Sequence, residues 1–168
     1  MRKLCTAALI LLLALPATVA TAQEAAPERA FVERLPRAWC GSFRWEDDVR
    51  EQLVTIAFTR VVVLPDGKIE ADGPGLVRYQ DEPASEAIPF RIRAVIEPAT
   101  RRIEMFEAID VPRPGYVTDG SHVGELVPDL QSMRLVWTTR STGKRGDLEL
   151  GARPARADLA LACAPPAS

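Results

Sequence analysis

The 168-residue sequence contains a single histidine and only three cysteines. Zinc and similar ions are held by clusters of Cys, His and carboxylate ligands, so this set makes a poor metal site and we expect no bound metal. The sequence also lacks a glycine-rich phosphate loop, a nucleophile elbow and a cysteine nucleophile. We therefore expect no cofactor and assign no catalytic residue, and a binding role is favoured over an enzymatic one.

Long apolar runs are absent except at the start of the chain. Residues 1–22 have the three parts of a secretory signal, which are the basic Met1–Lys3, the apolar Leu4–Leu15 and the cleavage site Ala20–Ala22. The apolar run is shorter than the ~20 residues that a membrane-spanning helix needs. We predict cleavage before Gln23, no stable membrane span in the mature protein, and a periplasmic or secreted location.

Positive charge is scarce as well. Once Arg2 and Lys3 are removed with the signal, 19 basic residues remain against 23 acidic ones. No run of basic residues is longer than the pair Arg101-Arg102. A negative chain without a basic patch argues against nucleic acid as a partner.

Two cysteines, Cys40 and Cys163, remain in the mature chain. An even number in an exported protein predicts a disulfide bond between them. The bond would close a loop of more than 100 residues and stabilise the protein by up to ~5 kcal/mol. Two free buried thiols or a metal pair are the alternatives.

Short strands separated by turns dominate the pattern after an N-terminal tether, residues 23–37. The tether is expected to hold one short helix, from Pro27 to Glu33. The clearest alternation is Ile88–Glu97, where apolar residues occupy every second position as in a half-buried strand. Pro65–Gly67 has the composition of a hairpin turn. The expected strands are residues 39–45, 53–64, 68–71, 76–80, 88–97, 101–109, 130–139, 147–150 and 159–163.

Three local features qualify this pattern. Gly73–Gly75 is expected to break the chain between two strands, and the change of parity at Phe106 and Ala108 suggests a β-bulge. Residues 110–121, with two prolines and two glycines, are expected to form the longest loop.

About eight to ten short antiparallel strands indicate an all-β domain over residues 38–164, either a small barrel or a β-sandwich. The barrel is favoured because the first and last strands of a closed up-and-down sheet are neighbours. Cys40 and Cys163 would then bridge the seam.

Two segments carry a resemblance to a known group of folds. Trp39–Phe43 opens the meander with a Trp-Cys-Gly sequence, and Met133–Thr138 leads through a turn into Gly146–Leu150. This arrangement resembles the calycin-type small barrels, the lipocalin and avidin group. The resemblance implies a protein that binds a ligand or inhibits another protein.

Aromatic residues are the candidate ligand-binding side chains. Trp39, Trp45, Tyr79, Trp137 and Tyr116 would either line a cavity or fill it, because the interior of an eight-stranded barrel can be closed by side chains.

Acidic residues and the one histidine are the candidates for chemistry. Asp119, Ser121 and His122 are the residue types of a catalytic triad, but neighbours on an extended chain point to opposite sides, so a hydrogen-bonded loop is the favoured interpretation. Glu46–Asp48 and Asp81-Glu82 are interpreted as solvated loop charges.

Three functions are thus open. The first is a soluble envelope protein that binds a small molecule or another envelope protein. The second is an envelope hydrolase that uses loop acids near Asp119 and His122. The third is a small outer-membrane barrel.

Overall fold

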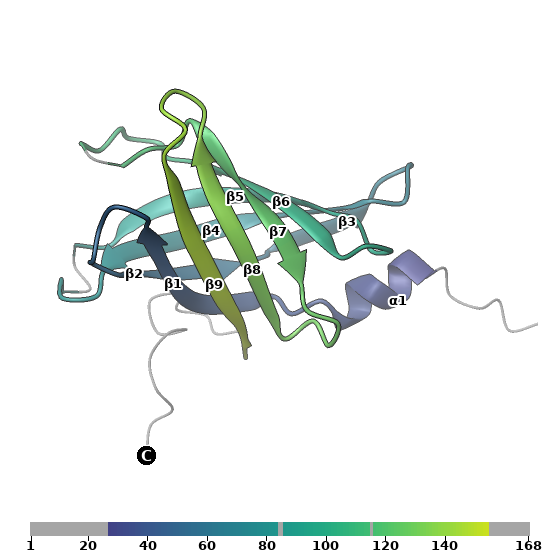
Figure 1. Cartoon of the computed structure of the whole chain (residues 1–168). Coiled ribbons are helices and arrows are strands. Elements are labelled where there is room, and N and C mark those ends of the chain that lie inside the picture. The colour runs from purple at the N-terminus through teal and green to yellow at the C-terminus, as the bar shows by residue number, and fades with distance from the viewer. Residues whose placement is uncertain (1–26, 84–85, 115, 155–168) are drawn as a thin grey trace, which may run out of the picture.

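A closed antiparallel barrel forms the body of the protein (Figure 1). The computed structural model describes residues 27–83, 86–114 and 116–154, and these ranges hold one helix and nine strands. They are α1 (Pro27–Arg34), β1 (Ala38–Trp45), β2 (Gln52–Ala57), β3 (Arg60–Val63), β4 (Ile69–Tyr79), β5 (Ile88–Ile96), β6 (Arg102–Ala108), β7 (Gly120–Leu126), β8 (Ser132–Thr139) and β9 (Arg145–Arg153). Strands β1, β2 and β4–β9 pair in a ring, and β3 pairs with β4 beside it. The predicted barrel is confirmed, and the alternative of a sandwich is wrong.

The ring closes between β1 and β9, the first and last strands that are described. Their pairing runs from Ala38 opposite Arg153 to Trp45 opposite Gly146. The predicted segment 147–150 therefore supplies the closing strand. The predicted signal peptide (1–22), the segment 159–163 and Cys163 lie outside the described residues, and the disulfide stays a prediction.

Alternation of side chains along each strand fills the interior. In β5, for example, Phe90, Ile92, Ala94 and Ile96 are buried, and the arginines between them are exposed. Because each strand contributes every second side chain, the barrel has one continuous apolar core. Within the described residues, no helix is both long and apolar enough to cross a membrane.

The β2–β4 region differs from the prediction in two ways. The expected strand 53–64 is two strands, and the expected break at Gly73–Gly75 is absent because β4 runs through it. Gly73 and Pro74 lie opposite the junction of β2 and β3, and they belong to neither the β2–β4 ladder nor the β3–β4 ladder. The N–H that proline lacks is therefore not needed for strand pairing on this side of β4. A Cβ atom at Gly73 would collide with the carbonyl oxygen of Ala57, so glycine permits this close approach.

The predicted helix and hairpin are confirmed. The helix α1 begins at Pro27, which is tolerated at the first helical position, and ends before Pro36. At the turn, Gly67 adopts φ 81° and donates its N–H to the carbonyl oxygen of Leu64 at 3.0 Å. Glycine adopts this left-handed conformation without the strain that a side chain would add.

Two predictions between residues 101 and 126 are wrong. The register of β5 with β6 is unbroken from Ile96 opposite Ile103 to Arg91 opposite Ala108, so there is no bulge at Phe106 and Ala108. The expected loop 110–121 also ends earlier, at β7, a strand that was not predicted. The position of the ladder neighbours, and not the apolar character of the chain, decides which side chains face inward here.

The two ends of the barrel differ. At one end α1 leads into β1 (Figure 1), and its Phe31 and Val32 pack against the core that includes the fully buried Trp39. The indole N–H of Trp39 donates to the carbonyl oxygen of Pro36 at 3.1 Å, and its ring meets Phe58 edge to face. At the opposite end the β1–β2, β4–β5 and β6–β7 loops surround the barrel mouth. We call these the helix end and the loop end.

Candidate ligand-binding site

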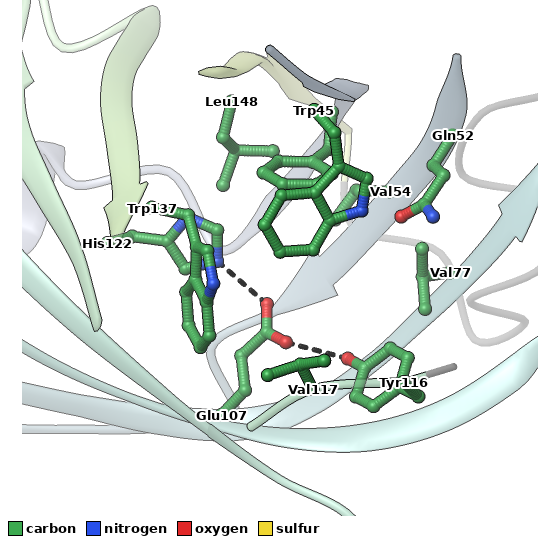
Figure 2. Close-up of a pocket in the computed structure, with 11 residues that line it drawn as sticks. Trp45, Gln52, Val54, Val77, Glu107, Tyr116, Val117, His122, Trp137 and Leu148 are labelled. Carbon is green, nitrogen blue, oxygen red and sulfur yellow. Dashed lines mark hydrogen bonds and ion pairs between the residues drawn. The ribbon is translucent and has the colours of Figure 1, made fainter. Parts of the chain in front are cut away.

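A cavity of about 40 Å³ lies inside the barrel at the loop end (Figure 2). Seven strands and the β6–β7 loop contribute its walls. The lining residues are Phe43, Trp45, Gln52, Val54, Val77, Glu107, Tyr116, Val117, His122, Trp137 and Leu148. The interior is thus plugged by side chains near the helix end and incompletely filled near the loop end.

A carboxylate projects into this cavity from β6. Glu107 follows Ile103 and Met105 at every second position, so it faces inward with them, and its side chain is only 12 % exposed. One carboxylate oxygen, Oε1, lies 2.9 Å from Nε2 of His122, and the other, Oε2, accepts a 2.6 Å hydrogen bond from the hydroxyl of Tyr116. Burial of a carboxylate without hydrogen bonds is costly, and here each of the two oxygens has a hydrogen-bond partner that offsets this cost.

His122 and Tyr116 reach Glu107 from different elements. His122 points inward from β7, opposite Met105, and its side chain is 4 % exposed. Tyr116 comes from the β6–β7 loop, which folds back so that the ring lies beside Phe90. Figure 2 shows all three side chains converging at the cavity.

Aromatic rings surround this polar group. The imidazole of His122 lies 4.7 Å from the Trp137 ring and 5.9 Å from the Phe43 ring, centroid to centroid. Phe43 in turn meets Trp45 edge to face at 4.9 Å. The carboxylate therefore sits in a largely apolar wall, where electrostatic interactions are stronger than in water.

Two nitrogen atoms of the site have no hydrogen-bond partner in the described structure. They are Nε1 of Trp137 and Nδ1 of His122, and both are buried. Native proteins pair nearly all such groups, so a buried indole N–H without an acceptor needs an explanation. Trp39 at the helix end is the contrast, because its N–H is paired with Pro36.

Burial, and then the charge of Glu107, raise the pKa of the Tyr116 hydroxyl well above its usual range. The hydroxyl is therefore neutral at ordinary pH and serves as a donor to the carboxylate. Among the described residues no lysine or arginine forms an ion pair with Glu107, and His122 is its only titratable ion-pair partner.

The predicted aromatic candidates divide into two groups. Trp45, Trp137 and Tyr116 line the cavity. Trp39 is fully buried at the helix end, and Tyr79 lies outside the cavity with the Arg50 guanidinium 4.0 Å from its ring centroid. The cavity thus brings together two of the three tryptophans.

Asp119 and His122 have different hydrogen-bond partners. The Asp119 carboxylate accepts a hydrogen bond from the backbone N–H of Ser141, whereas His122 pairs with Glu107. The interpretation of His122 as part of a hydrogen-bonded loop is wrong, because it belongs to β7.

The acidic clusters lie on the surface. Asp48 pairs with Arg50, Asp47 with Lys144 and Glu46 with Arg145, all at exposed positions of the loop end. Glu82 accepts a hydrogen bond from the backbone N–H of Tyr79. In the described parts of the chain, no three His, Cys, Asp or Glu side chains are grouped to hold a metal ion.

Comparison with protein-family models and with curated proteins finds no match for this chain.

The buried hydroxyl of Tyr116 gives a pH prediction. Its folded-state pKa lies above the unfolded value of about 10, so its contribution to stability is complete below pH ~10 and is lost as the pH rises further. When the protein unfolds in urea above pH 10, the Tyr116 hydroxyl should lose its proton. The tyrosinate absorbance should then increase, and the released proton should consume base. Tyr116→Phe, which leaves Tyr79 as the one tyrosine, should lack this increment. An equal increment in the variant would contradict the assignment.

Proposed function

We propose that this protein is an exported small barrel that binds a small molecule at its loop end. The observation that carries the proposal is the Glu107 carboxylate, held by His122 and Tyr116 beside a cavity inside an otherwise apolar barrel. Ligand sites in proteins are typically concave and apolar, with a few convergent polar groups that fix the ligand.

A purely structural role explains this group poorly. Replacing a buried polar network by apolar side chains usually costs nothing in stability, so such networks need another reason to be there. The helix end of the same barrel is filled by apolar side chains, and its one indole N–H is paired. At the loop end, Trp137 lines the cavity and its buried N–H has no acceptor in the described structure.

The sequence supports the exported part of the proposal. The signal peptide predicted at residues 1–22 and the disulfide predicted between Cys40 and Cys163 would both fit an envelope or secreted protein. A closed meander whose first and last described strands pair is also compatible with the resemblance to ligand-binding calycins.

A panel of small molecules, screened by thermal shift against the purified mature protein, tests the proposal. We expect members of the panel to raise the melting temperature and Val117→Trp, at the cavity wall, to abolish the shift. Val111→Trp is the matched control, since Val111 lies on the same β6–β7 loop and does not line the cavity. No shift with any member, or equal shifts in the two variants, would refute binding at this site.

A further inference from the structure

The charge of Glu107 is the starting point. Its two hydrogen-bond donors are the neutral hydroxyl of Tyr116 and the imidazole of His122. Among the described residues no lysine or arginine forms an ion pair with this carboxylate. A buried charge without an opposite charge is unfavourable, so the empty space next to it favours a cation.

The walls of the cavity suit a cation as well. Four aromatic residues line it, Phe43, Trp45, Tyr116 and Trp137, and the faces of aromatic rings carry negative electrostatic potential. An ammonium group within about 6 Å of such a ring is attracted to its face. The protein already makes this contact at the mouth, where the Lys144 ammonium lies 4.5 Å from the Trp45 ring centroid.

The loops around the mouth are rich in acids. The β1–β2 loop, residues 46–51, has four acidic residues and one arginine, and the β4–β5 loop, residues 80–87, has three acidic residues and no basic one. The β8–β9 turn supplies Arg140 and Lys144. The negative excess would attract a cationic ligand and repel an anionic one as they approach.

Size and the indole of Trp137 narrow the ligand further. A cavity needs a volume of about 10–15 Å³ to hold one water molecule. A cavity of about 40 Å³ therefore admits a group of only a few heavy atoms. The N–H of Trp137 requires an acceptor, which an oxygen atom of the same ligand would provide.

We propose that the cavity binds a compact ammonium group with a neighbouring oxygen acceptor, as in a short amino alcohol, and that Glu107 pairs with the ammonium while Trp137 donates to the oxygen. This inference rests on the proposed function, because it identifies the ligand of the same cavity.

The test uses the indole N–H signals of the ¹⁵N-labelled mature protein, one for each of the three tryptophans. Ethanolammonium is titrated alongside ethylene glycol, which has the same heavy-atom skeleton without the charge, and glycolate, which is an anion. We expect a saturable shift of the Trp137 signal with ethanolammonium at a Kd about tenfold or more below that of ethylene glycol. The Trp39 signal should not move and serves as the internal reference.

Glu107→Gln keeps the shape of the side chain and removes its charge. In this variant the preference for ethanolammonium over ethylene glycol should be lost. A preference for ethanolammonium that survives in Glu107→Gln would overturn the inference.

The remaining outcomes separate the two proposals. Equal binding of ethanolammonium and ethylene glycol to the unaltered protein would mean that the Glu107 carboxylate does not select for a cation. That result, or tighter binding of glycolate, would refute the proposal that the ligand is a cation. It would leave the proposed small-molecule binding unaffected. If neither these probes nor any member of the panel binds, the proposed function itself fails.

Discussion

Replacing Trp39 by alanine should lower the free energy of unfolding by about 3–5 kcal/mol. Its side chain is 0 % exposed and fills the helix end of the barrel against Phe58. The substitution removes these contacts, leaves a cavity, and takes the donor away from the carbonyl oxygen of Pro36. Urea denaturation followed by circular dichroism measures the loss.

Trp45→Ala is the matched control. Trp45 lies on the same face of β1 but at the loop end, where it is only partly buried. We expect this substitution to cost about 1–2 kcal/mol, because less apolar surface returns to water. Equal losses for the two variants would contradict the distinction between a packed helix end and an incompletely filled loop end.

The strands were predictable wherever apolar and polar residues alternate strictly. Ile88–Glu97 illustrates this, since β5 occupies nearly the same residues with the expected face inward. The turn at Gly67 was equally predictable, because its residues set the backbone conformation locally. Both features depend on neighbours in the sequence alone.

The centre of the site was not predictable in the same way. Glu107 lies between Phe106 and Ala108 in the sequence. Because these two neighbours are apolar, we expected a bulge that turns them inward and therefore turns Glu107 outward. The unbroken register with β5 keeps Glu107 on the inner face instead. A useful signal was present in the sequence, because the period of two that begins at Ile103 and Met105 reaches residue 107 if it is not interrupted.

His122 was misplaced for a related reason. The glycines at positions 120 and 124 weakened the strand pattern, although both occur in β7. Their lack of a side chain permits neighbouring backbone to approach, which depends on strand pairing and not on local sequence. The antiparallel pairing of β6 with β7, in which Met105 lies opposite His122, brings the imidazole next to the Glu107 carboxylate.

The seam of the barrel is where the predicted disulfide would act. Cys40 alternates with the inward-facing Trp39 on β1, so it belongs to the outer face, and it lies opposite Gly151 of β9. Nine residues lie between Arg153, the end of β9, and Cys163, and at up to ~3.6 Å per residue this length suffices to return to Cys40. The bond would then join the two ends of the barrel chain across the strands that close it.

Conversion of both Cys40 and Cys163 to serine should therefore lower the free energy of unfolding by about 3–5 kcal/mol, since the cross-link restricts the unfolded chain over more than 100 residues. Urea denaturation of the oxidised protein and of the double variant measures the difference. A thiol reductant should destabilise the unaltered protein by the same amount and leave the variant unchanged. If the native mature protein carries two free thiols by mass spectrometry, the bond does not exist, and the β1–β9 ladder alone holds the barrel closed.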